Sequence, residues 1–190
     1  MIKRRALLGL VTLAAGARHA RAADEAAAWQ ALRAGGCALL MRHAQTEPGI
    51  GDPPGFRLHD CRTQRNLSAA GRAQAQRFGE RLRGAGVRID EVRSSQWCRC
   101  LDTARLAFPA LPVQPFAPLN SFFDDRRTEP EQSAAVRRYL AALGAHTALL
   151  VTHQVNISAL TGEFAAMGDA VVVRAAAEGA LRVLGRLRDG

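Results

Sequence analysis

Two histidines follow two short apolar segments of the sequence. Residues 37–41 are followed by Arg42 and His43, and residues 148–152 are followed directly by His153. Apolar runs of this length, bounded by polar or glycine residues, are typical of buried strands. In open α/β sheets, ligands bind beyond the carboxyl ends of the strands. If the two segments are neighbouring strands, both histidines face one pocket.

Two arginines would make that pocket cationic. Arg42 adjoins the first histidine, and Arg99 lies one turn into an expected helix that follows a third strand. Guanidinium groups donate paired hydrogen bonds to phosphate. A cation early in a helix opposes the helix dipole, so Arg99 is better explained as an anion ligand than as a structural residue. Each of these residues alone is more often structural, but their arrangement at three strand ends predicts a phosphoryl-binding site.

The elements that would position these residues alternate between helix and strand. We expect helices over residues 24–34, 68–83, 96–107, 128–143 and 154–160. We expect strands over residues 37–41, 91–94, 113–116, 148–152, 171–173 and 181–187, the last two antiparallel. Such alternation predicts an α/β fold, a three-layer α/β/α sandwich with a mostly parallel central sheet.

Two local patterns refine this prediction. Residues 44–67 contain several Pro and Gly breakers and predict a long loop, which in compact domains is often functional. Thr128 and Glu131 form a Thr-x-x-Glu capping box that would begin the fourth helix.

Residues 1–22 have the pattern of a cleavable export signal. Three basic residues at 3–5 precede an uncharged apolar run over 6–17, and Ala20-Arg21-Ala22 fits an A-x-A cleavage site. The run is too short to span a bilayer, so we expect no stable membrane insertion after cleavage. The pair Arg4-Arg5 favours a twin-arginine signal, with a general secretory signal as the alternative. The sequence thus predicts an exported, periplasmic protein with one domain over residues 23–190.

The net charge is mostly a property of that signal. The 190 residues carry 26 Lys+Arg and 17 Asp+Glu, for a net charge of +9. Cleavage would remove five basic residues and no acidic one, which lowers the net charge to +4. Nucleic-acid binding is therefore not expected, and an aromatic content of 5% argues against a base-stacking platform.

Four cysteines allow one disulfide in an oxidising compartment. Cys98 and Cys100 are too close in sequence to pair comfortably with each other, so we expect Cys61 to pair with one of them. The alternative is a metal site of His59 with the three cysteines. Its spacings match none of the usual zinc patterns, so no metal is expected.

Four ordered motifs resemble the histidine phosphatase superfamily, which has the phosphoglycerate-mutase-like fold. Arg42-His43-Ala44 resembles its Arg-His-Gly signature. Residues 67–75 resemble its L-[ST]-x-x-G-x-x-Q-A segment, residues 94–104 its S-S-x-x-x-R-x-x-x-T-A segment, and residues 151–153 its strand with the second histidine. The matches span residues 37–160, most of the expected mature chain.

The resemblance implies a role for each matched side chain. His43 would be the nucleophile that becomes a transient phosphohistidine, with its tautomer fixed by a carbonyl or an acid. Arg42, Arg99 and a protonated His153 would bind the phosphoryl oxygens and stabilise the transition state. No metal and no cofactor is implied.

The sequence departs from the family in ways that leave the proton donor open. Ala44 replaces the usual glycine, and Gln154 follows the second histidine where many members have glycine. The donor must then come from the loop after residues 113–116, where Asp125 and Asp124 are the candidates, with Glu129 behind them.

These observations predict an exported, metal-independent phosphomonoesterase of the histidine acid phosphatase type. Its substrate would be a small-molecule or glycolipid phosphomonoester. Residues 152–162 also resemble a subgroup that includes the lipopolysaccharide core heptose phosphatases. The main alternative is a non-catalytic phospholigand-binding protein of the same fold. A serine hydrolase that uses Ser94 or Ser95 with His153 would lack the usual G-x-S-x-G elbow.

Overall fold

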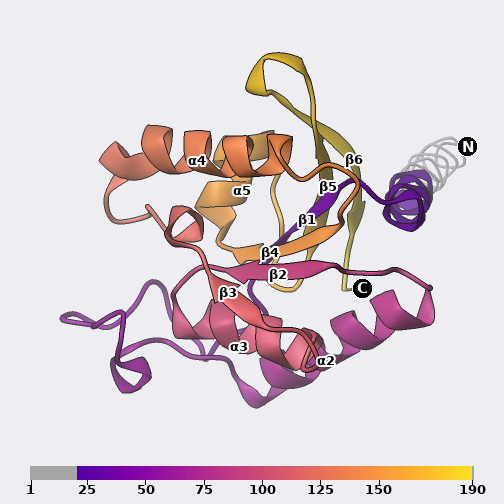
Figure 1. Ribbon diagram of the computed structural model, residues 1–190. Coiled ribbons are helices and arrows are strands. Elements are labelled where there is room, and N and C mark those ends of the chain that lie inside the picture. Colours follow the sequence, from indigo (N-terminus) through magenta and orange to yellow (C-terminus); the bar gives the residue numbers. More distant parts are fainter. Residues whose placement is uncertain (1–20, 190) are drawn as a thin grey trace, which may run out of the picture.

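The computed structural model describes residues 21–189 and is built on a single six-stranded sheet (Figure 1). The strand order is β3-β2-β4-β1-β5-β6. The strands are β1 (Ala38–Arg42), β2 (Glu91–Ser94), β3 (Val113–Pro115), β4 (Ala148–Thr152), β5 (Ala170–Ala175) and β6 (Leu181–Leu187). The helices are residues 21–34, α2 (Ala69–Gly84), α3 (Cys98–Ala107), α4 (Glu129–Ala141) and α5 (Gln154–Thr161).

The four strands β3, β2, β4 and β1 are parallel, and β5 and β6 extend the sheet in antiparallel pairings. Strands β1 and β4 are neighbours, with Arg42 paired to Thr152. Because paired parallel strands end at the same edge, this register brings the residues that follow both strands together. The mostly parallel sheet and its antiparallel closing strands are confirmed.

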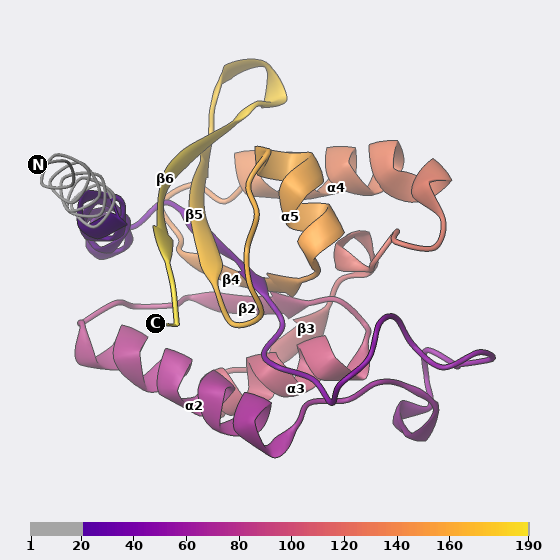
Figure 2. The ribbon, with the colours of Figure 1, turned by 180° about the vertical axis from the view of Figure 1, so that it is seen from behind.

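Helices cover both faces of the sheet and complete three layers (Figures 1 and 2). Alternate side chains of a strand point to opposite faces. Leu39 and Met41 therefore pack in the cluster that includes side chains of α2 and α3, whereas Ala38 and Leu40 pack in the cluster that includes α4 and α5. Every β4 residue is buried, as expected for a strand covered on both faces. The predicted three-layer fold is confirmed.

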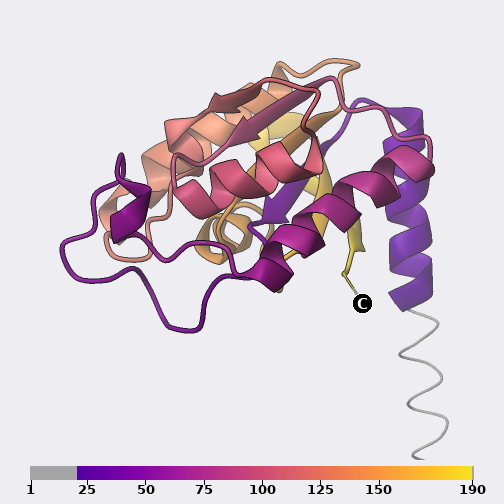
Figure 3. The same cartoon turned by 90° about the horizontal axis from the view of Figure 1, so that it is seen from below.

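Two glycines permit close packing around α2. A Cβ atom at Gly71 would overlap the backbone of Gln45, and one at Gly79 would overlap the backbone of Ala107. Gly71 thus lets the chain after β1 lie against the first turn of α2, and Gly79 lets α3 lie against α2 (Figure 3). The hydroxyl of Ser68 caps α2 by accepting a hydrogen bond from the Gly71 amide.

The predicted capping box at Thr128 is wrong. The residue has helical backbone angles, and its side chain makes no capping bond. A 3-10 turn, η3 (Arg126–Thr128), runs directly into α4, and the Thr128 hydroxyl donates to the Asp125 carbonyl instead. Because the turn already begins the helical path, the N-cap conformation is displaced to Asp125, whose carboxylate accepts from the Arg127 amide.

The first helix begins by residue 21, three residues earlier than expected. Residues 1–20, and with them nearly all of the predicted export signal, lie outside the described residues. Within residues 21–189, no helix is both long and apolar enough to cross a membrane.

Candidate active site

His43 and His153 meet at the carboxyl edge of β1 and β4, as the sequence predicted. Their ring centroids are 5.5 Å apart, and the His43 amide donates to the Thr152 carbonyl at 3.0 Å. Both rings are nearly buried. They line a cavity of about 460 Å³ together with Arg42 and Arg99. The structure thus places all four predicted phosphoryl-binding and nucleophilic residues at one cavity.

The backbone carbonyl of the next residue, Ala44, sets the tautomer of His43. Its Nδ1 lies 2.8 Å from the Ala44 carbonyl oxygen, which can only accept. Nδ1 therefore carries the proton, and Nε2 keeps the lone pair that a nucleophile needs. The Ala44 amide donates to Thr103 Oγ1 at 3.0 Å, and that hydroxyl donates to the Arg99 carbonyl. Thr103 thus connects the backbone at Ala44 to the backbone at Arg99 and holds the segment after His43 in place.

The surroundings of His43 keep it uncharged. Burial, together with the positive charges of Arg99, Arg42 and Arg65, lowers the pKa of His43 to about 3 and outweighs the opposing effect of the Ala44 carbonyl. A neutral imidazole near neutral pH is the form that can attack phosphorus.

Both arginines contain a buried side-chain nitrogen that has no hydrogen-bond partner among the described residues. Arg42 donates through Nη1 to the Ala165 carbonyl at 3.1 Å. Among the residues that the structure describes, the buried Nε atoms of Arg42 and Arg99 have no hydrogen-bond partner. Burying an unpaired charged donor is costly, so such groups usually have a ligand. Two guanidinium groups that line one cavity beside a neutral histidine are suited to binding an anion.

Asp52 is a site residue that sequence reasoning missed. Its carboxylate accepts from Arg99 Nη1 at 2.8 and 3.0 Å and from Trp97 Nε1 at 3.0 Å. Burial opposes its ionisation, but the bonds from Arg99, the Arg65 amide and Trp97 outweigh burial and lower the pKa of Asp52. In the sequence, Asp52 was recognisable only as part of a turn-forming segment. The length of the 44–67 loop was the single indication that this segment has a function.

The same loop contributes a third guanidinium. Arg65 lines the cavity and binds the loop backbone, donating to the Gly49 and Gly51 carbonyls at 2.8 Å each. It also donates to Thr46 Oγ1 at 2.7 Å. Arg65 thereby holds together distant parts of the loop, which extends away from the sheet in Figure 2, and residues 49–52 of that loop also line the cavity. Gln64 and Asn66, its neighbours, bond only to backbone groups nearby.

His153 is oriented by a chain of hydrogen bonds. Asn120 Oδ1 accepts from the Gln96 amide, and Ser95 Oγ donates to that same oxygen at 3.2 Å. Ser95 Oγ also lies 2.9 Å from His153 Nε2, so it accepts there and places a proton on Nε2. Burial and the nearby His43, Arg99 and Arg42 lower the pKa of His153 well below its usual value. Burial and these neighbouring groups thus disfavour an imidazolium at His153 in the free protein, and the protonated His153 expected during catalysis stays a prediction for the phosphoryl-bound state.

This geometry argues against the serine hydrolase alternative. Ser95 lies within hydrogen-bond distance of His153, as that alternative requires. However, both Ser94 and Ser95 are completely buried. A nucleophile must reach its substrate, and these hydroxyls cannot.

The three candidate proton donors lie in different places. Asp124 is exposed and lines the same cavity as His43. Asp125 does not line it and instead pairs with Arg127 at 2.7 Å, whose hydrogen bonds lower the pKa of Asp125 to about 2. Glu129 pairs with Arg126 on the surface. The proton-donor role expected for Asp125 is not supported, because its carboxylate caps η3 and stays ionised.

The cysteines form the expected disulfide, with Cys61 bonded to Cys98. Both are therefore unavailable for the alternative metal site. Within residues 21–189, no three His, Cys, Asp or Glu side chains gather as metal ligands. Cys37 and Cys100 are free and buried, and burial raises the pKa of Cys100 to about 12. A thiol that stays protonated is a poor nucleophile.

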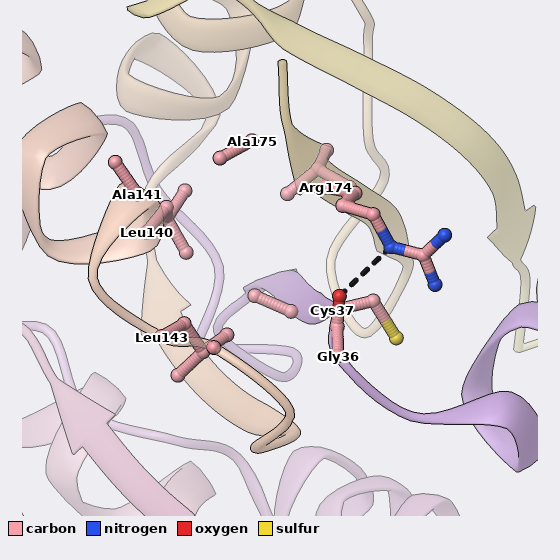
Figure 4. Close-up of a pocket in the computed structure, with 10 residues that line it drawn as sticks. Gly36, Cys37, Leu140, Ala141, Leu143, Arg174 and Ala175 are labelled. Carbon is pink, nitrogen blue, oxygen red and sulfur yellow. Dashed lines mark hydrogen bonds between the residues drawn. The ribbon is translucent and has the colours of Figure 1, made fainter. Parts of the chain in front are cut away.

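A separate cavity of about 340 Å³ lies at the opposite end of β1. Its lining is mostly aliphatic, including Leu140 and Leu143 (Figure 4). Arg174 donates to the Gly36 and Gly35 carbonyls, so its guanidinium is already engaged. Cys37 is buried there, and burial raises its pKa. This cavity lacks the groups for phosphoryl chemistry.

The sequence matches the model of the histidine phosphatase superfamily (branch 1) over residues 38–120. This region contains β1, the long loop, α2, β2 and α3, and thus His43, Arg42 and Arg99. No curated protein sequence is similar enough to the chain to count as a relative.

Solved structures of this superfamily's phosphatases share the fold. The protein histidine phosphatase SixA, solved with tungstate, is 16% identical, covers 80% of this chain and 97% of its own, and has a TM-score of 0.61. A mycobacterial glucosyl-3-phosphoglycerate phosphatase is 18% identical, with coverage of 77% and 96% and a TM-score of 0.57. The α-ribazole phosphatase of Shigella flexneri is 20% identical, with coverage of 78% and 96% and a TM-score of 0.53. The phosphoglycerate-mutase-like fold is confirmed, and the lipopolysaccharide heptose phosphatase subgroup remains a prediction.

Proposed function

We propose that this protein is a phosphomonoesterase that works through a phosphohistidine on His43. The observation that carries the proposal is the setting of His43 itself. Its Nδ1 is engaged by the Ala44 carbonyl, and its pKa of about 3 leaves Nε2 unprotonated. The guanidinium-bearing residues Arg42 and Arg99 line the same cavity.

The proposed reaction has two steps. In the first, His43 Nε2 attacks phosphorus, an N–P bond forms, and the P–O bond to the alcohol breaks. In the second, water attacks phosphorus, the N–P bond breaks, and inorganic phosphate leaves. Arg42 and Arg99 stabilise the developing charge in both steps. A bound phosphoryl dianion would also favour a protonated His153, because it offsets the neighbouring guanidinium charges.

We assign the proton transfers to Asp124. Of the two carboxylates that line the cavity, Asp52 is held ionised by Arg99, whereas Asp124 is exposed and forms no ion pair with a described residue. Asp124 would protonate the leaving alcohol in the first step and accept a proton from water in the second. An Asp124→Asn variant should lose about 10²–10⁴-fold in kcat on alkyl phosphates. It should lose less on 4-nitrophenyl phosphate, whose leaving group needs little protonation.

The test of the mechanism is hydrolysis of 4-nitrophenyl phosphate in EDTA. We expect turnover by the native chain and none by His43→Ala. The matched control is His146→Ala, because His146 is exposed and lies outside the cavity. Rapid quench with ³²P-labelled substrate should leave acid-labile, alkali-stable label on the native chain. Stable label in His43→Ala, or turnover that stops in EDTA, would overturn this mechanism.

One observation favours a non-catalytic phospholigand-binding protein as the second candidate. Asp52 and Asp125 are both bound to arginines, so the protein depends on the exposed Asp124 for its acid. If Asp124 does not serve, the same pocket would bind phosphate without turnover. Tight calorimetric binding of phosphate or tungstate, with no hydrolysis of any ester, would favour this candidate.

We further propose export to the periplasm on the basis of residues 1–22. Mass spectrometry of the protein recovered from the periplasm should find Ala23 at its amino terminus. Arg4→Lys with Arg5→Lys should block export if the signal is of the twin-arginine type. Recovery of the uncleaved chain from the cytoplasm alone would overturn this proposal.

A further inference from the structure

Large apolar side chains gather at the rim of the candidate cavity. Three large hydrophobic side chains are exposed in the part of the chain that the structure describes: Ile50 (93%), Phe123 (58%) and Phe164 (70%). All three line the cavity that contains His43 and Arg99. Single exposed hydrophobic residues are ordinary, but here all of them gather at one place.

These three residues come from separate parts of the sequence. Ile50 lies in the loop between β1 and α2, Phe123 follows the short 3-10 turn η2 (Ala117–Leu119), and Phe164 lies between α5 and β5. Three loops of different origin thus converge on one opening. None of the three side chains is buried in the core, so the folded chain gains little from their hydrophobicity.

The cavity is therefore cationic at its buried base, whereas three large apolar side chains lie beside the exposed Asp124 at its mouth. Arg42, Arg99 and His43 form the cationic base, and Val155 and Met167 add apolar surface to the lining. A phosphoryl group bound at the base would direct the rest of its ester towards the rim. The rim can then contact whatever the phosphate is attached to.

We infer that the substrate is an amphiphilic phosphomonoester whose apolar leaving group lies against Ile50, Phe123 and Phe164. The inference rests on the proposed phosphatase function and specifies its substrate class. A compact polyhydroxylated sugar phosphate would leave these side chains in contact with water or polar groups. An alkyl or aromatic group on the alcohol would instead bury them, and burial of apolar surface favours binding.

The test compares n-octyl phosphate, below its critical micelle concentration, with ethyl phosphate. Both release a primary alcohol, so their intrinsic reactivity is alike and kcat/KM reports contacts beyond the reacting atoms. We expect the native chain to prefer the octyl ester by about tenfold or more. A triple Ser variant at residues 50, 123 and 164 should reduce that ratio towards one while keeping its kcat/KM for ethyl phosphate.

The matched control is Phe123→Leu with Phe164→Leu, which keeps the rim apolar and should keep most of the preference. Because all three side chains are exposed, the Ser variant should fold, and circular dichroism checks this. Equal kcat/KM values for the two esters in the native chain would overturn the inference. So would a preference that survives in the Ser variant.

If the proposed phosphatase function itself is wrong, neither ester is hydrolysed, and this result differs from a failure of the inference about the rim. If neither ester is hydrolysed, calorimetric titration with the same two esters still tests the rim, and the native chain should bind octyl phosphate more tightly than the Ser variant does. Equal affinities would overturn the inference. If the Ser substitutions instead convert a dimer into a monomer in sedimentation, the rim is a contact between two copies of the chain, and the inference is again overturned.

Discussion

Asp52 and Arg99 form a buried ion pair in the lining of the candidate site. Their side chains are 5% and 6% exposed, and Arg99 Nη1 lies 2.8 Å from Asp52 Oδ1. The pair connects the long loop after β1 to the first turn of α3. Arg99 therefore both anchors the loop through Asp52 and lines the cavity that contains His43.

Removing Asp52 should therefore be costly. Asp52→Ala leaves a buried guanidinium without its counterion, and we expect a loss of about 3–5 kcal/mol in the free energy of unfolding, measured with urea. The control is Asp102→Ala, because Asp102 pairs with two exposed arginines at 3.7 Å and should cost about 0–1 kcal/mol. Asp52→Ala combined with Arg99→Met should recover much of the loss. Equal costs for the two single variants would contradict the prediction.

The two buried histidines should make stability depend on pH. The pKa of His43 is lowered to about 3, and that of His153 is also lowered well below its usual value. As pH falls below about 6.5, the unfolded chain binds protons at these histidines and the folded chain does not, so stability decreases. His43 should contribute a loss of about 2 kcal/mol by pH 5, and His153 should add a further loss in the same direction. His43→Gln should remove the part of this stability loss that His43 causes, whereas a substitution of the exposed His146 should not. Urea unfolding midpoints measured at pH 7 and at pH 5 test this prediction.

Ser95 should act as a positioning residue for His153. Ser95→Ala removes the acceptor for His153 Nε2 and should lower kcat by about tenfold or more. The loss of this acceptor also disfavours the imidazolium, so the basic limb of the pH–kcat profile should move to lower pH. Ser94→Ala is the matched control, because Ser94 is equally buried but donates to the Ser95 carbonyl. A lower kcat with an unmoved pH profile would indicate a structural role alone.

The disulfide should contribute substantially to stability. Cys61 and Cys98 are 37 residues apart, and a loop of this length corresponds to a gain of roughly 4 kcal/mol in a chain-entropy model. Cys61→Ser with Cys98→Ser should lose that amount in urea unfolding. The native chain should lose as much when it is reduced by dithiothreitol. Cys37→Ala with Cys100→Ala keeps the disulfide, and its response to the reductant should match that of the native chain.

The placement of His43 and His153 illustrates how far local sequence patterns reach. Apolar runs of five residues predicted β1 and β4, and the polar residues directly after them predicted the site. This works because strand burial is recorded locally in consecutive apolar residues, and parallel neighbours must end at one edge. The motif spacing also located Arg99 correctly, since a short turn after β2 leads directly into α3, whose first turn contains Arg99.

The long loop contains a site residue, Asp52, whose role local sequence patterns could not predict. Nothing near Asp52 in the sequence distinguishes it from a solvated loop residue, because its partners Arg99 and Trp97 lie more than forty residues away. The sequence could not distinguish the roles of Asp124 and Asp125 for the same reason. Two adjacent carboxylates differ only in which one the fold turns towards the cavity and which one it gives to Arg127.

The sequence by itself determined the alternation of elements, the edge of the sheet at which the candidate site lies, and the positions of His43, Arg42 and Arg99 in that site. Only the tertiary structure decided the charge of His153, the role of Asp52 and the apolar rim. The physical reason is that these properties depend on burial and on charges brought together from distant segments. A side chain's pKa and its partners are properties of the space around it, which the order of residues specifies only through the complete fold.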